Sequence, residues 1–290
     1  MTVLTNEQLH VRKMTREELD LCLGWAAELG WNPGLHDAEA FWAADPDGYV
    51  VAEYGGEIIG TGAIIAYGRH VGAMGLFIVR EDHRGGGLGR ELWYKRKEML
   101  QSRLDPGASI GMDGVVAMQP FYAKGGFEFA HTVARHQGNF PSLIPTEGTV
   151  DLATVPFEQV AAFDLAHFGA PRDSFLKIWN QPREGAARAI LDNQGTLRAV
   201  GVIRRSTDGY RIGPLFAQTP EQAETLFLDL ASHAQGAPVF LDVPTVNEPA
   251  IAMATRHGMV EVFACGRMYL GTPPPLPWKE IYGVTSLELG

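Results

Sequence analysis

Residues 76–93 of this 290-residue chain, LFIVREDHRGGGLGRELW, decide its fold. An apolar strand, residues 76–79, is followed by a glycine-rich loop, residues 84–89, and then directly by a helix. Glycines let successive backbone N–H groups turn inward, and the first turn of the helix adds unpaired donors and the positive end of its dipole. This layout predicts an anion site that would hold phosphate oxygens.

Spacing separates three kinds of phosphate loop. The dinucleotide fingerprint needs glycine at its first, third and sixth positions, but the sixth position is an arginine counted from Gly85 and a leucine counted from Gly87. The nucleoside-triphosphatase loop ends in Gly-Lys-Ser/Thr, and no such tripeptide stands here. What fits is Arg-x-x-Gly-x-Gly, formed by Arg84, Gly87 and Gly89.

With this spacing the segment resembles the GNAT superfamily of acyl-CoA-dependent N-acyltransferases. Downstream, residues 121–127, FYAKGGF, resemble the Tyr-x-x-x-Gly-Phe segment of that family. Two nearby positions depart from the family, because Val115 and Met118 stand where its members often carry Asn and Ala.

The resemblance implies acetyl-CoA as co-substrate, with its pyrophosphate in the glycine loop. It implies Tyr122 as the general acid that reprotonates the departing CoA thiolate. It also implies that the strand before the loop presents backbone groups to the pantetheine arm. The expected coenzyme A site consists of Phe77, Ile78, Val79, Arg84, Gly85, Gly86, Gly87, Leu88, Gly89 and Arg90.

The two halves of the chain repeat one order of expected elements: helix, helix, three strands, helix, strand, helix, strand. Residues 139–148, rich in Pro, Gly and polar residues, read as a linker, so we expect domains at 1–140 and 141–290. Together with the resemblance, this order predicts a tandem of two GNAT-like domains of the α/β (α+β) class. Each would have a mixed, mostly antiparallel central sheet flanked by helices.

The second half looks like the same fold with the chemistry removed. Residues 217–221, AQTPE, stand in place of the glycine loop, with no glycine and with an acid where phosphate would sit. Ala254 stands at the tyrosine position. We therefore expect one acyl-CoA site, in the first half. The second half would cover or shape the amine pocket, or else serve only as structural support.

Transfer to an amine needs a proton acceptor, so a carboxylate or an ordered water should serve as base. Asp113, at the end of a strand beside the expected acyl slot, is the first candidate, and Glu81, just after the preceding strand, is the second. The resemblance implies that the early helices border the acceptor cleft, which makes Trp31 and Trp42 candidates for the substrate pocket. Core packing explains both tryptophans equally well.

Composition excludes several classes of protein. The 34 acidic residues outweigh 24 Lys and Arg, a net charge of -10 that has the wrong sign for binding nucleic acid through its phosphates. No stretch of about 20 apolar residues occurs, and residues 1–14 lack the layout of a signal peptide, so we expect a cytoplasmic protein with no membrane partner. Histidine and cysteine spacing predicts no metal site.

The sequence thus predicts an acetyl-CoA-dependent N-acetyltransferase that transfers an acetyl group to a primary amine of a small molecule by direct attack. The alternative is a non-catalytic acyl-CoA sensor or partner-binding module, which would bind coenzyme A without releasing thiol. The sequence leaves open the acceptor, including protein lysines, an acyl group longer than acetyl, and a monomeric or homodimeric state.

Overall fold

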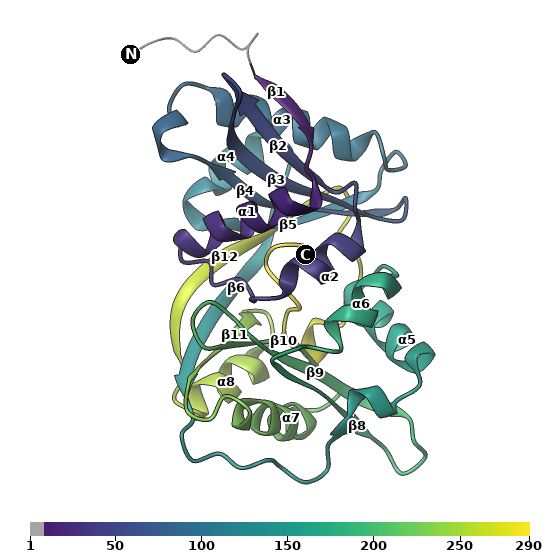
Figure 1. The fold of residues 1–290 in the computed structure, drawn as a ribbon. Helices are drawn as coiled ribbons and strands as arrows, with labels where there is room; N and C mark the ends of the chain where they lie inside the picture. The colour runs from purple at the N-terminus through teal and green to yellow at the C-terminus, as the bar shows by residue number, and fades with distance from the viewer. Residues whose placement is uncertain (1–8) are drawn as a thin grey trace.

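The computed structural model describes residues 9–290 (Figure 1). Most of the stretch used to judge the signal peptide, residues 1–8, lies outside the described residues. None of the helices in residues 9–290 combines the length and the apolar character needed to cross a bilayer.

The first half follows the predicted order of elements. Its helices and strands are β1 (His10–Lys13), α1 (Arg16–Glu28), α2 (Asp37–Ala44), β2 (Tyr49–Tyr54), β3 (Glu57–Tyr67), β4 (Val71–Val79), α3 (Leu88–Gln101), β5 (Ser109–Val115), α4 (Gln119–Lys124) and β6 (Glu128–Asn139). Helix α1 begins with a capping box, in which the Thr15 hydroxyl accepts from the Glu18 N–H and the Glu18 carboxylate accepts from the Thr15 N–H at 2.8 Å.

The second half repeats the order and adds two short strands, β7 and β13, that the sequence did not predict. Its elements are β7 (Val150–Asp151), α5 (Phe157–Phe168), α6 (Asp173–Trp179), β8 (Gly185–Leu191), β9 (Leu197–Arg205), β10 (Tyr210–Ala217), α7 (Pro220–Ser232), β11 (Pro238–Pro244), α8 (Glu248–Arg256), β12 (Val260–Leu270) and β13 (Ile281–Gly283). Among the strands of residues 9–290, only the β4–β5 and β10–β11 pairs are parallel, which confirms the mixed, mostly antiparallel character.

The strands form one continuous sheet because the two halves exchange their last long strands. The order is β1-β2-β3-β4-β5-β12-β6-β11-β10-β9-β8-β7. Strand β12 of the second half lies between β5 and β6 of the first, and β6 pairs in turn with β11. In Figure 1 the first half lies above and the second below, with β6 and β12 running between them. The linker therefore divides the sequence but not the sheet.

Helices cover both faces of this sheet. Helices α3 and α4 pack on one face of the first half around Trp93, which is fully buried. Helices α1 and α2 cover the other face and share one apolar core with α5 and α6 of the second half, where Phe41 stacks on Trp179 at 6.0 Å between ring centroids. Shared packing on this side adds to the shared sheet in joining the halves.

The segment after β12 turns back through the second half and ends in the first. Strand β13 pairs with β10 beyond the point where β10 stops pairing with β11. The Asn247 side chain donates to the Ile281 carbonyl at 2.9 Å and holds this strand in place. The chain then continues to the first half, where the Tyr67 hydroxyl donates to the Leu289 carbonyl at 3.0 Å.

Candidate active site

An opening between β4 and β5 forms the centre of the site. The two strands pair only over Val71–Ala73 and Ser109–Gly111, and β5 then continues along β12. In β4 a bulge places Leu76 at a φ of 47°, with its carbonyl accepting a hydrogen bond from the Thr61 hydroxyl at 3.0 Å. A bulge of this kind bends a strand and leaves backbone groups outside the ladder. A cavity of about 510 Å³ occupies the opening.

The glycine loop closes one end of this cavity. Gly85 and Gly87 have φ values of 83° and 92°, in the left-handed region, and Gly87 caps the start of α3. The N–H groups of residues 85–87 have no hydrogen-bond partner among residues 9–290. The Arg84 Nε donates to the Val79 carbonyl at 2.8 Å and so ties the loop to the end of β4.

Most residues of the expected coenzyme A site line the cavity. They are Phe77, Ile78, Val79, Arg84, Gly85, Gly87, Gly89 and Arg90. Gly86 is exposed at the turn and is not part of the wall, while Leu88 is buried in the core beneath α3. This anchoring of Leu88 is why α3 begins there, two residues earlier than the sequence predicted.

Tyr122 lies in α4, on the wall of the cavity. Its ring packs 4.8 Å from the Trp93 ring, and the residue is 5% exposed. Burial raises the pKa of the phenol to about 12, so it is protonated at neutral pH.

Arg96 is a buried cation that the sequence analysis did not select. It lies on α3, lines the cavity and is fully buried, with its guanidinium 4.9 Å from the centre of the Phe77 ring. None of its three side-chain nitrogens has a hydrogen-bond partner among residues 9–290. Burial lowers its pKa to about 10, which still leaves it charged at neutral pH. The cavity wall therefore carries a positive charge with no hydrogen-bond partner among residues 9–290.

The two candidate bases lie in different surroundings. Asp113 lines the cavity, but Arg267 of β12 donates to both of its oxygens, at 2.8 and 2.6 Å. Burial raises the pKa of Asp113 to about 6 against the opposing effect of Arg267. Glu81 is exposed in the one-turn helix Glu81–His83 and lies outside the cavity wall.

Of the two tryptophan candidates, only Trp31 lies on the cavity wall. Trp31 lines the cavity, and its carbonyl accepts a hydrogen bond from Arg135 at 2.7 Å. Trp42 instead stacks on Tyr49, at 6.0 Å between ring centroids, and packs against the core.

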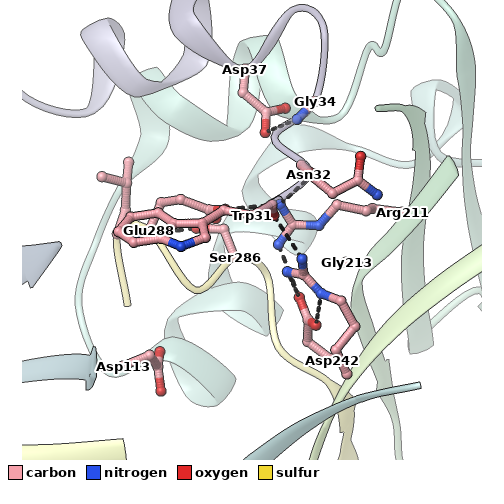
Figure 2. A network of polar contacts seen from close by, with 12 residues as sticks. Trp31, Asn32, Gly34, Asp37, Asp113, Arg211, Gly213, Asp242, Ser286 and Glu288 are labelled. Atoms are coloured by element: carbon pink, nitrogen blue, oxygen red, sulfur yellow. Dashed lines mark hydrogen bonds and ion pairs between the residues drawn. The ribbon is translucent and has the colours of Figure 1, made fainter. Parts of the chain in front are cut away.

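The second half contributes part of the cavity wall through Phe263, Cys265, Leu287 and Glu288. A buried chain of charges reaches this wall, in which Arg135 binds Asp242, Asp242 binds Arg211, and Arg211 binds Glu288 at 2.9 Å. Figure 2 shows Asp242, Arg211 and Glu288 of this chain. Burial alone would raise the pKa of Asp242, but Arg135 and Arg211 together hold it below its usual range. No motif marks these residues, because strand exchange and the returning segment bring them together.

The equivalent opening in the second half is filled by the chain itself. Strand β13 occupies the space where β10 leaves β11. Thr219, in the middle of the glycine-free stretch 217–221, forms an ordinary capping box with Gln222 for α7. Among the described residues, no group of three or more His, Cys, Asp or Glu side chains is arranged to hold a metal ion.

Both halves of the fold contain a parallel strand pair that opens and is followed by a helix, and the glycine loop stands only in the first half. Family models agree with it: the acetyltransferase (GNAT) family model matches residues 14–127, and an acetyltransferase (GNAT) domain model matches residues 160–283. The chain belongs to the GNAT family and is a tandem GNAT acyltransferase.

Particular relatives extend over nearly the whole chain. A holothin acyltransferase from Pseudoalteromonas sp. (strain SANK 73390) is 31% identical over 276 residues, which are 94% of this chain and 92% of the relative. Among solved structures, a putative acetyltransferase from Pyrococcus horikoshii superposes with a TM-score of 0.83 at 22% identity, covering 99% of this chain and 98% of the other. A tandem GNAT protein from the clavulanic acid biosynthesis pathway gives 0.62 at 15% identity, covering 92% and 99%. These two structures support the fold.

Proposed function

We propose that this acyltransferase uses acetyl-CoA to acetylate a primary amine of a small molecule. One observation carries the proposal: the cavity runs from the glycine loop, past the bulged part of β4, to the phenol of Tyr122. The free N–H groups of residues 85–87, the start of α3 and Arg84 suit a pyrophosphate, because backbone donors and a helix N-terminus favour anions. The apolar walls at Phe77 and Ile78 suit the pantetheine arm.

The chemistry follows from residues at the acyl end. The amine nitrogen attacks the thioester carbonyl carbon directly, and backbone N–H groups of β4 beyond its bulge stabilise the oxyanion in this proposal; the register shift in β4 supports it. As the C–S bond breaks, Tyr122 donates its proton to sulfur. A phenol with a pKa of about 12 holds that proton until a thiolate forms beside it.

Titration calorimetry with acetyl-CoA tests the proposal, together with detection of free thiol over a panel of primary amines. We expect binding by the wild type, a loss of affinity of about tenfold or more in Arg84→Glu, and thiol release that depends on the amine. Absence of acetyl-CoA binding would refute the proposal. Binding without thiol release would favour the acyl-CoA sensor instead.

A further inference from the structure

Glu288 is a buried carboxylate with one oxygen bound and the other free. Its side chain is 4% exposed, and Oε1 accepts a hydrogen bond from Arg211 Nη1 at 2.9 Å. Oε2 has no hydrogen-bond partner among residues 9–290. A buried carboxylate oxygen without a donor is costly, so an unpaired one indicates a group that arrives with a ligand.

The position of Glu288 places this oxygen at the reacting end of the cavity. Glu288 lines the same cavity as Tyr122. Its backbone lies directly against β4, since a Cβ atom on Gly75 would overlap the Glu288 carbonyl oxygen. Gly75 is next to the bulge at Leu76, where β4 begins to separate from β5. Glu288 therefore lies beside the part of β4 where the strand pair opens.

Glu288 has a free carboxylate oxygen, whereas Asp113, the other carboxylate on the cavity wall, has none. Both oxygens of Asp113 are occupied by Arg267, whereas Arg211 holds only one oxygen of Glu288. Arg211 is itself shared with Asp242, which also binds Arg135 (Figure 2). Glu288 is thus oriented by a cation and still has an oxygen free to accept.

The surroundings of Glu288 define the kind of molecule it can bind. The apolar residues that line the cavity with it are Trp31, Phe263, Leu29 and Leu287. The cavity wall also includes Arg96 and Arg135, and Arg135 is paired with Asp242. A carboxylate among aromatic and aliphatic walls matches a primary ammonium on an aromatic or apolar body, because the cation pairs with the acid and the body covers the rings.

We propose that Glu288 binds the ammonium group of the acceptor and takes its first proton, and that the acceptor is a primary amine on an aromatic or apolar body. The transfer itself rests on the proposed function. The ammonium gives one proton to Glu288, its lone pair attacks the thioester carbon, and the C–N bond forms as the C–S bond breaks. Tyr122 protonates sulfur, the second nitrogen proton restores the phenol, and the proton on Glu288 passes to water.

The test compares the wild type with Glu288→Gln, which removes the charge and keeps the shape. Tryptamine and phenethylamine serve as probe amines, with spermidine as a polar contrast. We expect kcat/KM for tryptamine to fall by about 100-fold or more, with acetyl-CoA affinity unchanged. Glu280→Gln is the matched control, because Glu280 lies on the same returning segment, contacts His167 at 3.2 Å and is not part of the cavity wall.

A second variant, Glu288→Asp, keeps the test informative if Glu288→Gln does not fold. Glu288→Asp keeps the charge beside Arg211 and withdraws the carboxylate by one methylene, so it should lower kcat/KM for tryptamine by about tenfold with acetyl-CoA binding intact. Normal turnover in both variants would overturn the role of Glu288 and leave the acetyl transfer standing. A preference for spermidine over both aromatic amines would overturn the substrate class.

If the wild type acetylates no amine, the proposed function fails, and amine binding to the enzyme saturated with coenzyme A decides the present inference. Tryptamine affinity about tenfold weaker in Glu288→Gln than in the wild type and in Glu280→Gln would support the ammonium site. Equal affinity in all three proteins, or no binding to the wild type, would overturn it.

Discussion

Asp113 and Arg267 join the two halves of the chain through a buried, bidentate ion pair. They face each other across β5 and β12, with N···O distances of 2.8 and 2.6 Å, and the Asp113 side chain has no exposed surface. The ion pair therefore holds the exchanged strand β12 against β5, and it also fixes the side chain of Asp113 on the cavity wall.

Removing one partner leaves the other charge buried without compensation, which typically costs about 3–5 kcal/mol. We expect Asp113→Asn to lower the free energy of unfolding by an amount in that range, measured by urea denaturation. Asp105→Asn is the control, because its ion pair with Arg69 lies at the surface and should matter far less. Equal losses in the two variants would contradict a structural role for the Asp113–Arg267 pair.

A substitution at Gly87 tests whether the glycine loop binds acetyl-CoA. A control with the same kind of backbone strain elsewhere distinguishes a loss of binding from a loss of protein stability. The φ of 92° at Gly87 is strained for any residue with a Cβ, by roughly 1–2 kcal/mol, although the space around it is open. Gly87→Ala should therefore weaken acetyl-CoA binding by about tenfold in calorimetry. Gly68→Ala introduces the same kind of strain at a φ of 69° in the turn between β3 and β4, away from the cavity, and should leave binding unchanged.

Tyr122→Phe should lower kcat by about 10²-fold or more with little change in acetyl-CoA affinity, because it removes a proton donor and keeps the ring. Because the pKa of the phenol is about 12, its protonation should not limit activity between pH 7 and about pH 10. Steady-state rates across this range check both points. Tyr94→Phe, a change on α3 outside the cavity wall, is the control. Unaltered turnover in Tyr122→Phe would remove Tyr122 from the mechanism.

Arg96 should reduce the stability of the protein when no ligand is present. Replacing a buried, unpaired charge with an apolar side chain of similar length is often stabilising, by about 1–4 kcal/mol. We expect Arg96→Met to raise the free energy of unfolding, measured by urea denaturation, and to reduce turnover. A loss of stability would show that the stacking of Arg96 on Phe77 and Trp93 outweighs the cost of its burial.

His131 makes stability depend on pH. Burial lowers its pKa to about 4, below the ordinary value near 6.5. The unfolded chain therefore binds a proton at His131 between pH 6.5 and 4 when the folded chain does not, so stability falls as the pH falls through this window, by up to about 3 kcal/mol. His131→Gln should reduce this slope in urea denaturation at pH 7, 5.5 and 4.5. A slope identical to that of the wild type would contradict the assignment.

Local sequence was enough for the parts of the fold that local chemistry determines. The glycine loop and the order of elements in each half were both predicted, since each depends on neighbours in sequence. The exchange of β6 and β12 was not, because strands of either half satisfy the same alternation of apolar residues.

The acceptor side of the cavity was predictable only in part. Trp31 was a candidate through the family resemblance and Asp113 through its place at the end of a predicted strand, and both lie on the wall. Glu288 carries no local signal, since its position depends on β13, on Asn247 and on contact with Gly75, all distant in sequence. Arg96 looked like one of several polar residues on α3, and only its depth distinguishes it.

The exchanged strands also affect whether one half of the chain could be lost in evolution. Either half made alone would present unpaired edges where the other half's strand belongs, and such edges aggregate. A second half that has lost its own phosphate loop therefore cannot be discarded by a deletion that spares the first. Selection on the half that carries the glycine loop would therefore retain both halves.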